Sequence, residues 1–265
     1  MITIAEKINA SIPSAKKIIE SRDEERLIEL ARSQAEAGAD YIDVNVGTGS
    51  GSQEDEMAAM AWAVTTIQKE IDTPLCIDSA DYKVLEAGLK VRDERPALIN
   101  STKGSDKYLT DVISLAKVYD KPLVGLAMDE DGIPKTVEKR VEACLKIADA
   151  CNHFGVDTAN LFFDPLVLPV ATDVNQGKIT LDTITAIKQA IPQARTVMAV
   201  SNVSFGLPKR HIFNTAFLHM AIMAGLDAAI LNVLDQDLVG AAKTAEAIMG
   251  SDRHCRKYSR FWRKR

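Results

Sequence analysis

Eight short apolar runs alternate with eight amphipathic stretches in this chain, and this alternation restricts the fold more than any other feature. The apolar runs are typical of buried strands and predict strands at 2–6, 41–46, 75–78, 97–100, 123–128, 161–163, 196–200 and 228–231. The stretches with helical spacing predict helices over about 23–38, 54–70, 82–90, 108–119, 137–154, 180–190, 213–224 and 238–249. Strict alternation indicates parallel strands joined by helical crossovers.

The number of units and the chain length favour a closed barrel. Eight strand–helix units in 265 residues are typical of the (β/α)8 TIM barrel, an α/β fold. An open sheet that binds a dinucleotide would have a glycine-rich turn after its first strand, and here Asn9-Ala10-Ser11-Ile12-Pro13 follows instead. No linker or low-complexity segment interrupts the pattern, so we predict a single barrel domain over 1–265.

The composition excludes several classes of protein. Apolar residues make up 46% of the chain and charged residues 26%, which is ordinary for a globular protein. No apolar run approaches the roughly 20 residues of a membrane span, and the N-terminus lacks the layout of a signal peptide. We therefore expect a cytoplasmic protein without a membrane contact. The four cysteines have no zinc-type or C-x-x-C spacing and are expected to be free thiols.

The net charge of −5 is unevenly distributed. The segment 251–265 holds seven of the 32 basic residues, and the rest of the chain is strongly acidic. An acidic body argues against nucleic acid as the main partner. We expect the basic C-terminal tail to be a solvated or helical end, and its alternative role is to dock onto an acidic partner protein.

Polar side chains gather where the predicted strands end, which is where this fold places its chemistry. Seven of the eight ends carry Asp or Asn, and the exception is Met128. In order along the chain, the residues at these ends are Asn9, Asp43 with Asn45, Asp78, Asn100, Met128, Asp164, Asn202 and Asn232. One such residue means little, because Asp and Asn also cap helices and form turns. Asp164 follows the apolar run Leu161-Phe162-Phe163, and a buried unpaired carboxylate is costly. It must therefore meet solvent in a cleft or hold a ligand.

The chemistry of these side chains restricts the ligand. Carboxylates accept hydrogen bonds and amides both donate and accept, so the set suits a neutral, nitrogen-rich ring with N–H donors along one edge. Phosphate would need backbone N–H groups, Lys or Arg. The alternative is a Mg²⁺ site of Asp43, Asp78 and Asp164. Such an enzyme would usually add a Lys or His base at a strand end; only Lys7 lies near one, so we expect no metal.

Seven short segments resemble the pterin-binding methyltransferase family, and most closely the methyltetrahydrofolate:corrinoid protein methyltransferases of anaerobic bacteria. They are spread over nearly the whole chain in the family's order. The segments are Glu6-Lys7-Ile8-Asn9, Asp43-Val44-Asn45-Val46-Gly47, Cys76-Ile77-Asp78-Ser79, Ile99-Asn100-Ser101-Thr102, Asp164-Pro165-Leu166, Ser201-Asn202-Val203-Ser204 and Gly225-Leu226-Asp227-Ala228-Ala229-Ile230. The resemblance implies a TIM barrel of the pterin-binding type.

The resemblance also implies roles for single residues. Asp164 would accept hydrogen bonds from the 2-amino group and N3 of the pterin, and Asn100 and Asp78 would bind its N1 and N8 side. Asn202 would lie near N5, the atom that bears the methyl group, as the catalytic residue. Arg210 would hold the same loop or the folate. Additional candidates, from their motif positions or from the predicted strand ends, are Glu6, Asn9, Asp43, Asn45, Met128 and Asn232.

The implied activity is methyl transfer between N5 of tetrahydrofolate and the cobalt of a corrinoid (cobalamin), in either direction. The methyl group would leave 5-methyltetrahydrofolate, or arrive from a methylated corrinoid as in O-demethylase and methylamine or betaine systems. The D-x-H-x-x-G signature of corrinoid-binding proteins is absent. A separate corrinoid protein would therefore dock transiently. The resemblance further suggests a homodimer, and the apolar residues of 213–224 pack either on a partner or on the barrel.

Two alternatives remain open. Dihydropteroate synthase shares the pterin pocket, but it needs a basic segment after the seventh strand for its pyrophosphate leaving group. Ser201-Asn202-Val203-Ser204 stands there instead. A non-catalytic folate-binding protein would keep the pterin contacts and carry out no transfer, and the presence of Asn202 and Arg210 argues against it.

Overall fold

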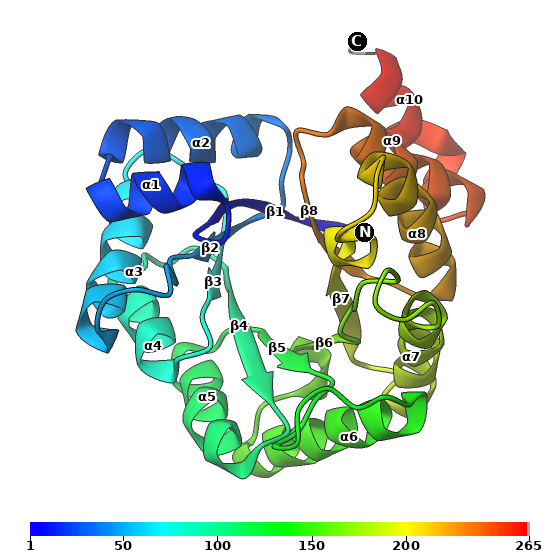
Figure 1. The fold of residues 1–265 in the computed structure, drawn as a ribbon, viewed down its shortest axis with the longest axis horizontal. Coiled ribbons are helices and arrows are strands. Elements are labelled where there is room, and N and C mark those ends of the chain that lie inside the picture. The colour runs from blue at the N-terminus through cyan, green and yellow to red at the C-terminus, as the bar shows by residue number, and fades with distance from the viewer. Residues whose placement is uncertain (264–265) are drawn as a thin grey trace.

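The computed structural model describes residues 1–263, apart from the side chain of Lys107, and its centre is a closed barrel of eight parallel strands (Figure 1). The strands lie in sequence order around the barrel, and the first pairs with the last. They are β1 (Ile2–Asn9), β2 (Tyr41–Asn45), β3 (Leu75–Asp78), β4 (Ala97–Lys103), β5 (Leu123–Leu126), β6 (Leu161–Asp164), β7 (Arg195–Ala199) and β8 (Ala228–Leu231). The predicted (β/α)8 barrel is thus confirmed.

Helices form a ring outside the barrel (Figure 1). The α-helices are α1 (Pro13–Ser21), α2 (Glu24–Glu36), α3 (Gln53–Gln68), α4 (Tyr82–Val91), α5 (Asp106–Tyr119), α6 (Val137–Phe154), α7 (Gln176–Ala190), α8 (Arg210–Ala224), α9 (Gln236–Ile248) and α10 (Arg256–Arg263). Three 3-10 helices are η1 (Thr158–Asn160), η2 (Val200–Ser204) and η3 (Arg253–Cys255). None of the described helices is long and apolar enough to cross a membrane.

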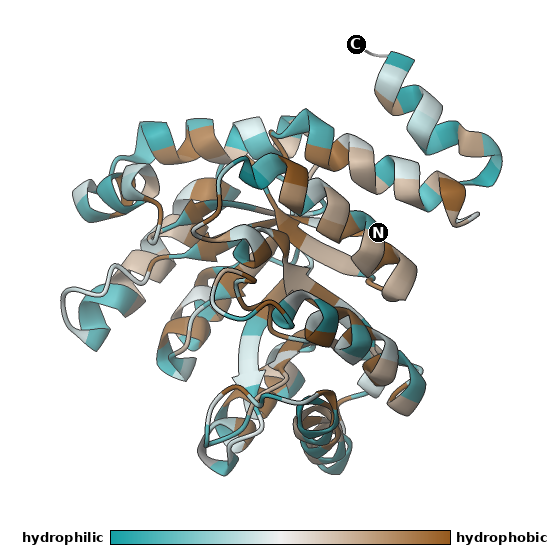
Figure 2. Cartoon of the chain, turned by 45° about the vertical axis from the view of Figure 1, so that its right-hand side comes forward, coloured by the Kyte–Doolittle hydropathy of each residue, from teal (hydrophilic) through white to brown (hydrophobic). Residues whose placement is uncertain are grey.

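The alternation of side chains between the two faces of each strand explains both the core and the site. Cys76, Leu98 and Phe162 are buried with side chains from five other strands in the lumen of the barrel. Because successive side chains of a strand point to opposite faces, the residue two positions further also points inward. Those residues are Asp78, Asn100 and Asp164, at the open end of the lumen. Figure 2 shows the apolar strands at the centre and helices of mixed polarity around them.

Some predicted boundaries were wrong. Residues 13–21 were not predicted as helical, yet they form α1, which begins with Pro13 at its first position, where the missing N–H costs nothing. Strand β5 ends at Leu126 and not at Met128, because Leu126 is the last residue that pairs with β6. Strand β7 ends at Ala199, and the chain then turns into η2, so Asn202 lies in a 3-10 helix beyond the strand.

The C-terminal tail is helical where the structure describes it. Helix α10 packs on α9, and the rings of Phe261 and Trp262 lie over Gly240. A Cβ atom at Gly240 would be 2.6 Å from the Trp262 ring, so only glycine permits this approach. Asp252 caps α10 by accepting from the backbone N–H groups of Lys257 and Tyr258. The last two basic residues of the predicted tail, 264 and 265, lie outside the described residues.

Candidate functional site

A cavity of about 710 Å³ opens at the carboxyl ends of the strands. Of the residues predicted for the site, those that line this cavity are Glu6, Asn9, Asp43, Asp78, Asn100, Asp164, Asn202, Arg210 and Asn232. Two predicted residues, Asn45 and Met128, are not among the lining residues. Met128 lies past the end of β5, where its carbonyl accepts from the N–H of Gly104. The fold therefore gathers most of the predicted residues around one space.

Four of the polar residues form a row across neighbouring strands. Asn9 of β1 pairs in register with Asn45 of β2, Asn45 with Asp78 of β3, and Asp78 with Asn100 of β4. In addition, Asn45 Nδ2 donates a hydrogen bond of 2.9 Å to Asp78 Oδ2. Asn45 thus lies behind the cavity wall and orients Asp78, which does reach the cavity.

Asp43 and Asp78 form a carboxylate pair in the cavity wall. Asp43 is 2% exposed, and its Oδ1 has no hydrogen-bond partner among the described residues. Burial raises the pKa of Asp43 well above its ordinary range, and the nearby charge of Asp78 raises it further. Burial also raises the pKa of Asp78 to about 6, and the hydrogen bond from Asn45 offsets part of that rise. Asp43 Oδ1 thus keeps acceptor capacity that no described residue uses and that a ligand with N–H groups would fill.

Asp164 is the third carboxylate of the cavity and lies at the end of β6. Its Oδ1 accepts a hydrogen bond of 2.7 Å from the backbone N–H of Leu166. Burial raises the pKa of Asp164 to about 7, while the Leu166 N–H and the positive charge of Arg140 offset part of the rise. No ion pair within 4.0 Å neutralises Asp164 among the described residues. It therefore keeps acceptor capacity directed at the cavity.

Glu6 on β1 is a further acid in the cavity wall. Burial raises the pKa of its carboxyl group, and the charge of Lys7 offsets part of that rise. Ser201 Oγ lies 3.5 Å from Glu6 Oε2 and connects β1 with the segment that carries Asn202. The contact thus links η2, which follows β7, to β1 at this edge of the cavity.

Arg210 holds the segment that carries Asn202. Its Nη2 donates to the carbonyl of Ser201 at 2.7 Å, and its Nε donates to Ser204 Oγ at 3.0 Å. Ser204 Oγ in turn donates to Asn214 Oδ1 at 2.7 Å. The Asn202 side chain is exposed and makes no hydrogen bond to another described residue. The amide is therefore free to meet a ligand, while the backbone under it is fixed.

Turn formation accounts for part of the Asp and Asn set, as their chemistry allows. Four side chains accept from the backbone N–H two residues further along, and they belong to Asn9, Asn45, Asp164 and Asn232. Asp43, Asp78, Asn100 and Asn202 show no such turn among the described residues. Local structure does not explain these four, whereas the turn at Asp164 uses its Oδ1 and leaves its Oδ2 for a ligand.

Sequence reasoning missed residues that the loops bring to the cavity. Ser11 and Ile12 follow β1, Phe205 and His211 lie on either side of the start of α8, and Asp235 follows β8. Each lies in or just past the loop after a predicted strand, which is the available signal. Nothing in their type or spacing indicated a contact. Among the described residues, no group of three or more His, Cys, Asp or Glu could hold a metal ion.

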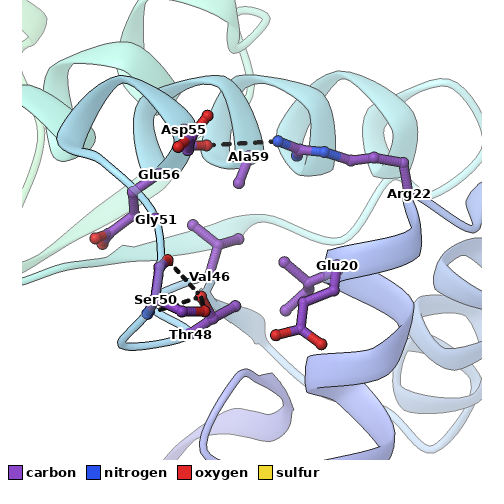
Figure 3. A pocket seen from close by; sticks show the side chains of 10 residues that line it. Glu20, Arg22, Val46, Thr48, Ser50, Gly51, Asp55, Glu56 and Ala59 are labelled. Atoms are coloured by element: carbon purple, nitrogen blue, oxygen red, sulfur yellow. Dashed lines mark hydrogen bonds between the residues drawn. The ribbon is translucent and has the colours of Figure 1, made fainter.

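A second, smaller cavity of about 280 Å³ lies between α1, the loop after β2 and α3 (Figure 3). Arg22 lines it and donates from Nη2 to the Asp55 carbonyl at 3.5 Å, and Thr48 Oγ1 donates to the Ser50 carbonyl at 3.0 Å. None of the predicted site residues lines it. Its polar groups bond to one another, and it shows no comparable set of unpaired acceptors.

Comparison with known protein families decides the relationship. Residues 6–232 match the family model described as pterin binding enzyme. The chain belongs to the pterin-binding enzyme family. One relative is the methylcorrinoid:tetrahydrofolate methyltransferase of Eubacterium limosum, which is 35% identical over 265 residues, 99% of this chain and 96% of the relative. The methionine synthase of Mycobacterium leprae is 30% identical over 245 residues, 88% of this chain but 20% of that enzyme.

Solved structures of this family have the same fold. A DHPS of Yersinia pestis, solved with a pterine–sulfa conjugate, has a TM-score of 0.71 and 15% identity, and the match covers 94% of each chain. The 7,8-dihydropteroate synthase of Vibrio fischeri has a TM-score of 0.71 and 16% identity, over 94% of this chain and 93% of that chain. At such low identity the likeness shows a shared barrel and leaves the reaction open.

Proposed function

We propose that this pterin-binding enzyme is a methyltransferase that moves a methyl group between N5 of tetrahydrofolate and the cobalt of a separate corrinoid protein, in either direction. The observation that carries the proposal is the full-length similarity to a methylcorrinoid:tetrahydrofolate methyltransferase. The similarity to two methionine synthases also supports it. The chain matches one part of these enzymes, about a fifth of their length, at 29–30% identity. Dihydropteroate synthases share the fold at 15–16% identity, which gives no support for their reaction.

The cavity suits the pterin ring as its ligand. Asp164 would accept from the 2-amino group and N3, because a carboxylate offers two acceptor oxygens to two parallel N–H donors. Asp78 and Asn100 lie in register on adjacent strands and would bind the N1 and N8 side. Asp43 Oδ1 has no partner among the described residues, and burial raises the pKa values of Asp78 and Asp164 despite the hydrogen bonds that they accept. All three carboxyl groups can therefore accept further donors. A ring with N–H groups along its edge would provide them.

Asn202 would act at N5. When the bond between N5 and the methyl carbon breaks, its electron pair stays on N5. Negative charge therefore develops on the nitrogen, which makes the amine a poor leaving group. A proton or a strong hydrogen bond at N5 stabilises that charge in the transition state. The exposed amide of Asn202 can supply the hydrogen bond, and Arg210 fixes the backbone beneath it. The acceptors around the ring would contribute by holding N5 toward the open mouth.

The corrinoid of the partner protein would supply the cobalt centre that accepts or donates the methyl group. The partner would dock briefly over the cavity mouth. We further propose a homodimer that uses α8. Phe217 and Leu218 pack on the barrel, so they are not part of this surface, whereas Met220 and Met223 are 55% and 75% exposed. Sedimentation velocity of the protein and of a Met223→Glu variant tests the homodimer, since a monomeric wild type would contradict it.

Two measurements on the purified protein test the function. Titration calorimetry with 5-methyltetrahydrofolate measures binding, and the absorbance of cobalamin measures methyl transfer to free Co(I) cobalamin. We expect binding and transfer. Failure to bind would contradict the pterin site, and binding without transfer to free cobalamin or to a corrinoid protein would leave a folate-binding protein. Formation of a pteroate from a pterin pyrophosphate would instead indicate the dihydropteroate synthase reaction.

A further inference from the structure

Arg140 in α6 has a side chain that is 0% exposed, and it is the largest fully buried side chain among the described residues. No carboxylate lies within ion-pair distance of it in the described part of the chain. A buried guanidinium without an ion pair is costly, and a well-packed apolar residue often serves stability equally well. Its presence in the core therefore points to a role other than stability.

The guanidinium instead connects three segments at the carboxyl end of the barrel. Its Nε donates to the carbonyl of Pro134 at 3.0 Å, before α6, and its Nη2 donates to Gln176 Oε1 at 3.2 Å, at the start of α7. Its Nη1 donates to two successive carbonyls, those of Pro165 at 2.8 Å and Leu166 at 2.9 Å. Both of these carbonyls belong to the chain directly after Asp164.

The chain after Asp164 has an unusual backbone that needs such support. Leu166 has a φ of +65°, in the left-handed region that residues with a side chain rarely adopt. In this conformation its N–H points back and donates to Asp164 Oδ1 at 2.7 Å. The two carbonyls held by Arg140 flank that N–H in the chain. Arg140 thus acts on Asp164 indirectly, because it holds the backbone turn whose N–H donates to the Asp164 carboxylate.

We propose that Arg140 is a positioning residue for the pterin site, because it holds the turn at Leu166 whose N–H orients the Asp164 carboxylate. This inference rests on the proposed function, in which Asp164 anchors the pterin. A second effect has the same origin. The positive charge of Arg140 lowers the pKa of Asp164 against the effect of burial. Because the pterin edge needs a carboxylate, this charge helps to keep Asp164 in its binding form.

The pH dependence of binding distinguishes this role from a purely structural one. The groups that act on Asp164 are Arg140 and the Cys144 thiol of α6, and Asp78 of β3. Burial raises the pKa of the Cys144 thiol, so the thiol stays neutral, and Asp78 disfavours the Asp164 carboxylate. Of these three groups, Arg140 is the one that favours the ionised form of Asp164. Removal of its charge should therefore raise the pH at which Asp164 ionises.

The test uses full-length Arg140→Met and Arg140→Lys, with 5-methyltetrahydrofolate binding measured by calorimetry from pH 5.5 to 9. For Arg140→Met we expect the Kd at pH 7 to rise about tenfold and the pH midpoint of binding to rise by about one unit, the effect of losing one nearby charge. For Arg140→Lys, which keeps the charge but cannot bond all three segments, we expect a similar midpoint and a weaker Kd by about fivefold.

Arg95→Met is the matched control, since Arg95 also donates to backbone carbonyls, but at the opposite end of the barrel. It should leave Kd and midpoint unchanged. Wild-type affinity and midpoint in Arg140→Met would overturn the inference, as would an equal loss of affinity in Arg95→Met. If Arg140→Met does not fold, Arg140→Lys decides alone, and a wild-type Kd would overturn it. A wild type that binds no folate would instead contradict the proposed function.

Discussion

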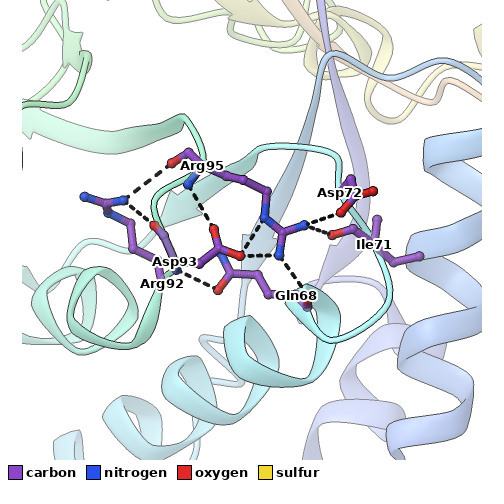
Figure 4. A network of polar contacts seen from close by, with 6 residues as sticks. All are labelled: Gln68, Ile71, Asp72, Arg92, Asp93 and Arg95. Carbon is purple, nitrogen blue, oxygen red and sulfur yellow. Dashed lines mark hydrogen bonds and ion pairs between the residues drawn. The ribbon is translucent and has the colours of Figure 1, made fainter.

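The acidic side chains at the amino end of the barrel and those that line the cavity at its carboxyl end differ in whether they are paired. At the amino end of the strands, the charges around Arg95 and Asp227 are paired. Arg95 bonds to Asp93 and to Asp72 Oδ1, and its Nη2 donates to the carbonyl of Gln68 at 2.8 Å (Figure 4). Asp227, just before β8, accepts from Lys188 Nζ and from the backbone N–H of Thr196, each at 2.9 Å. These groups satisfy one another and tie loops together.

At the carboxyl end, the acidic side chains that line the cavity have no ion pair among the described residues. Asp43 Oδ1 has no partner among the described residues, and the pKa values of Asp78 and Asp164 are raised by burial to about 6 and about 7. By contrast, Arg95 holds the pKa of Asp93 below its ordinary range. Carboxyl groups that destabilise the free protein are retained where a ligand is to be bound. The difference separates residues that hold the fold from residues that hold a ligand.

The same substitution at both ends should give the largest contrast. Asp164→Asn replaces one acceptor oxygen with an amide donor that faces the N–H edge of the pterin. We expect the Kd for 5-methyltetrahydrofolate to rise about 100-fold or more, because hydrogen bonds to a charged group are lost and a buried donor is left unpaired. Asp227→Asn should leave the Kd unchanged. Calorimetry on both variants measures the two values, and equal losses would erase the difference between the ends.

The stability of these variants should change with opposite sign. The pKa of Asp164 is raised in the folded state, so its favourable contribution is complete below pH 4 and is lost as the pH rises through about 7. At pH 8 Asp164→Asn should therefore be more stable than wild type by about 1 kcal/mol. Asp227→Asn should be less stable by about 1–2 kcal/mol, since it weakens charge-assisted bonds. Urea unfolding at pH 8 measures both, and a destabilised Asp164→Asn would contradict this account.

Asn202→Ala should separate transfer from binding. The side chain makes no hydrogen bond to another described residue, so its removal leaves the fold intact. We expect the rate of methyl transfer to fall about 100-fold, the scale of losing one preorganised hydrogen-bonding group, with the Kd within a few-fold of wild type. Stopped-flow absorbance of cobalamin gives the rate. Unchanged turnover would contradict a role for Asn202 at N5.

Folate binding should weaken as the pH falls. Asp164 and Asp78 accept hydrogen bonds as carboxylates, and their pKa values of about 7 and about 6 place the loss between pH 7.5 and pH 5.5. The Kd should rise by about 100-fold over this range, since each pH unit below a controlling pKa costs up to a factor of ten and two carboxyl groups contribute. In Asp164→Asn, the part of this pH dependence near pH 7 should be absent. A flat profile in the wild type would show that neither carboxyl group titrates there.

Much of the fold and part of the site could be predicted from the sequence. The apolar strands place Asp78, Asn100 and Asp164 at ends that share one face, since each lies two residues after a lumen side chain. The alternation of side chains along a strand is enough to place them there. It gave the positions of the main candidates at the cavity, whereas their contacts with a pterin remain predictions.

Other features could not be predicted because they depend on contacts distant in sequence. Met128 looked like a strand end, but the pairing of Leu126 with Asp164 ends β5 earlier. Arg140 has the sequence context of a solvated helix residue, and only the segment before α6 and the β6–α7 connection bury it. Asn202 was placed at a strand end and lies in η2, which Arg210 holds from α8. Local periodicity contains none of this information.

The smallest expected effect is at Asp93, whose carboxyl group has a lowered pKa at the amino end of the barrel. Its main cause is the hydrogen bond from the Arg95 side chain. Since the folded-state pKa is lowered, the stabilisation is present above about pH 4 and is lost as the pH falls through the lowered value. Asp93→Asn should therefore reduce the free energy of unfolding at pH 7 by about 0.5 kcal/mol, because the carboxyl group is exposed and screened. The gap from wild type should be smaller at pH 3 than at pH 7, while folate affinity at pH 7 stays unchanged. Urea unfolding at both pH values measures the gap, and a gap that widens in acid would place Asp93 with the unpaired carboxyl groups of the opposite end.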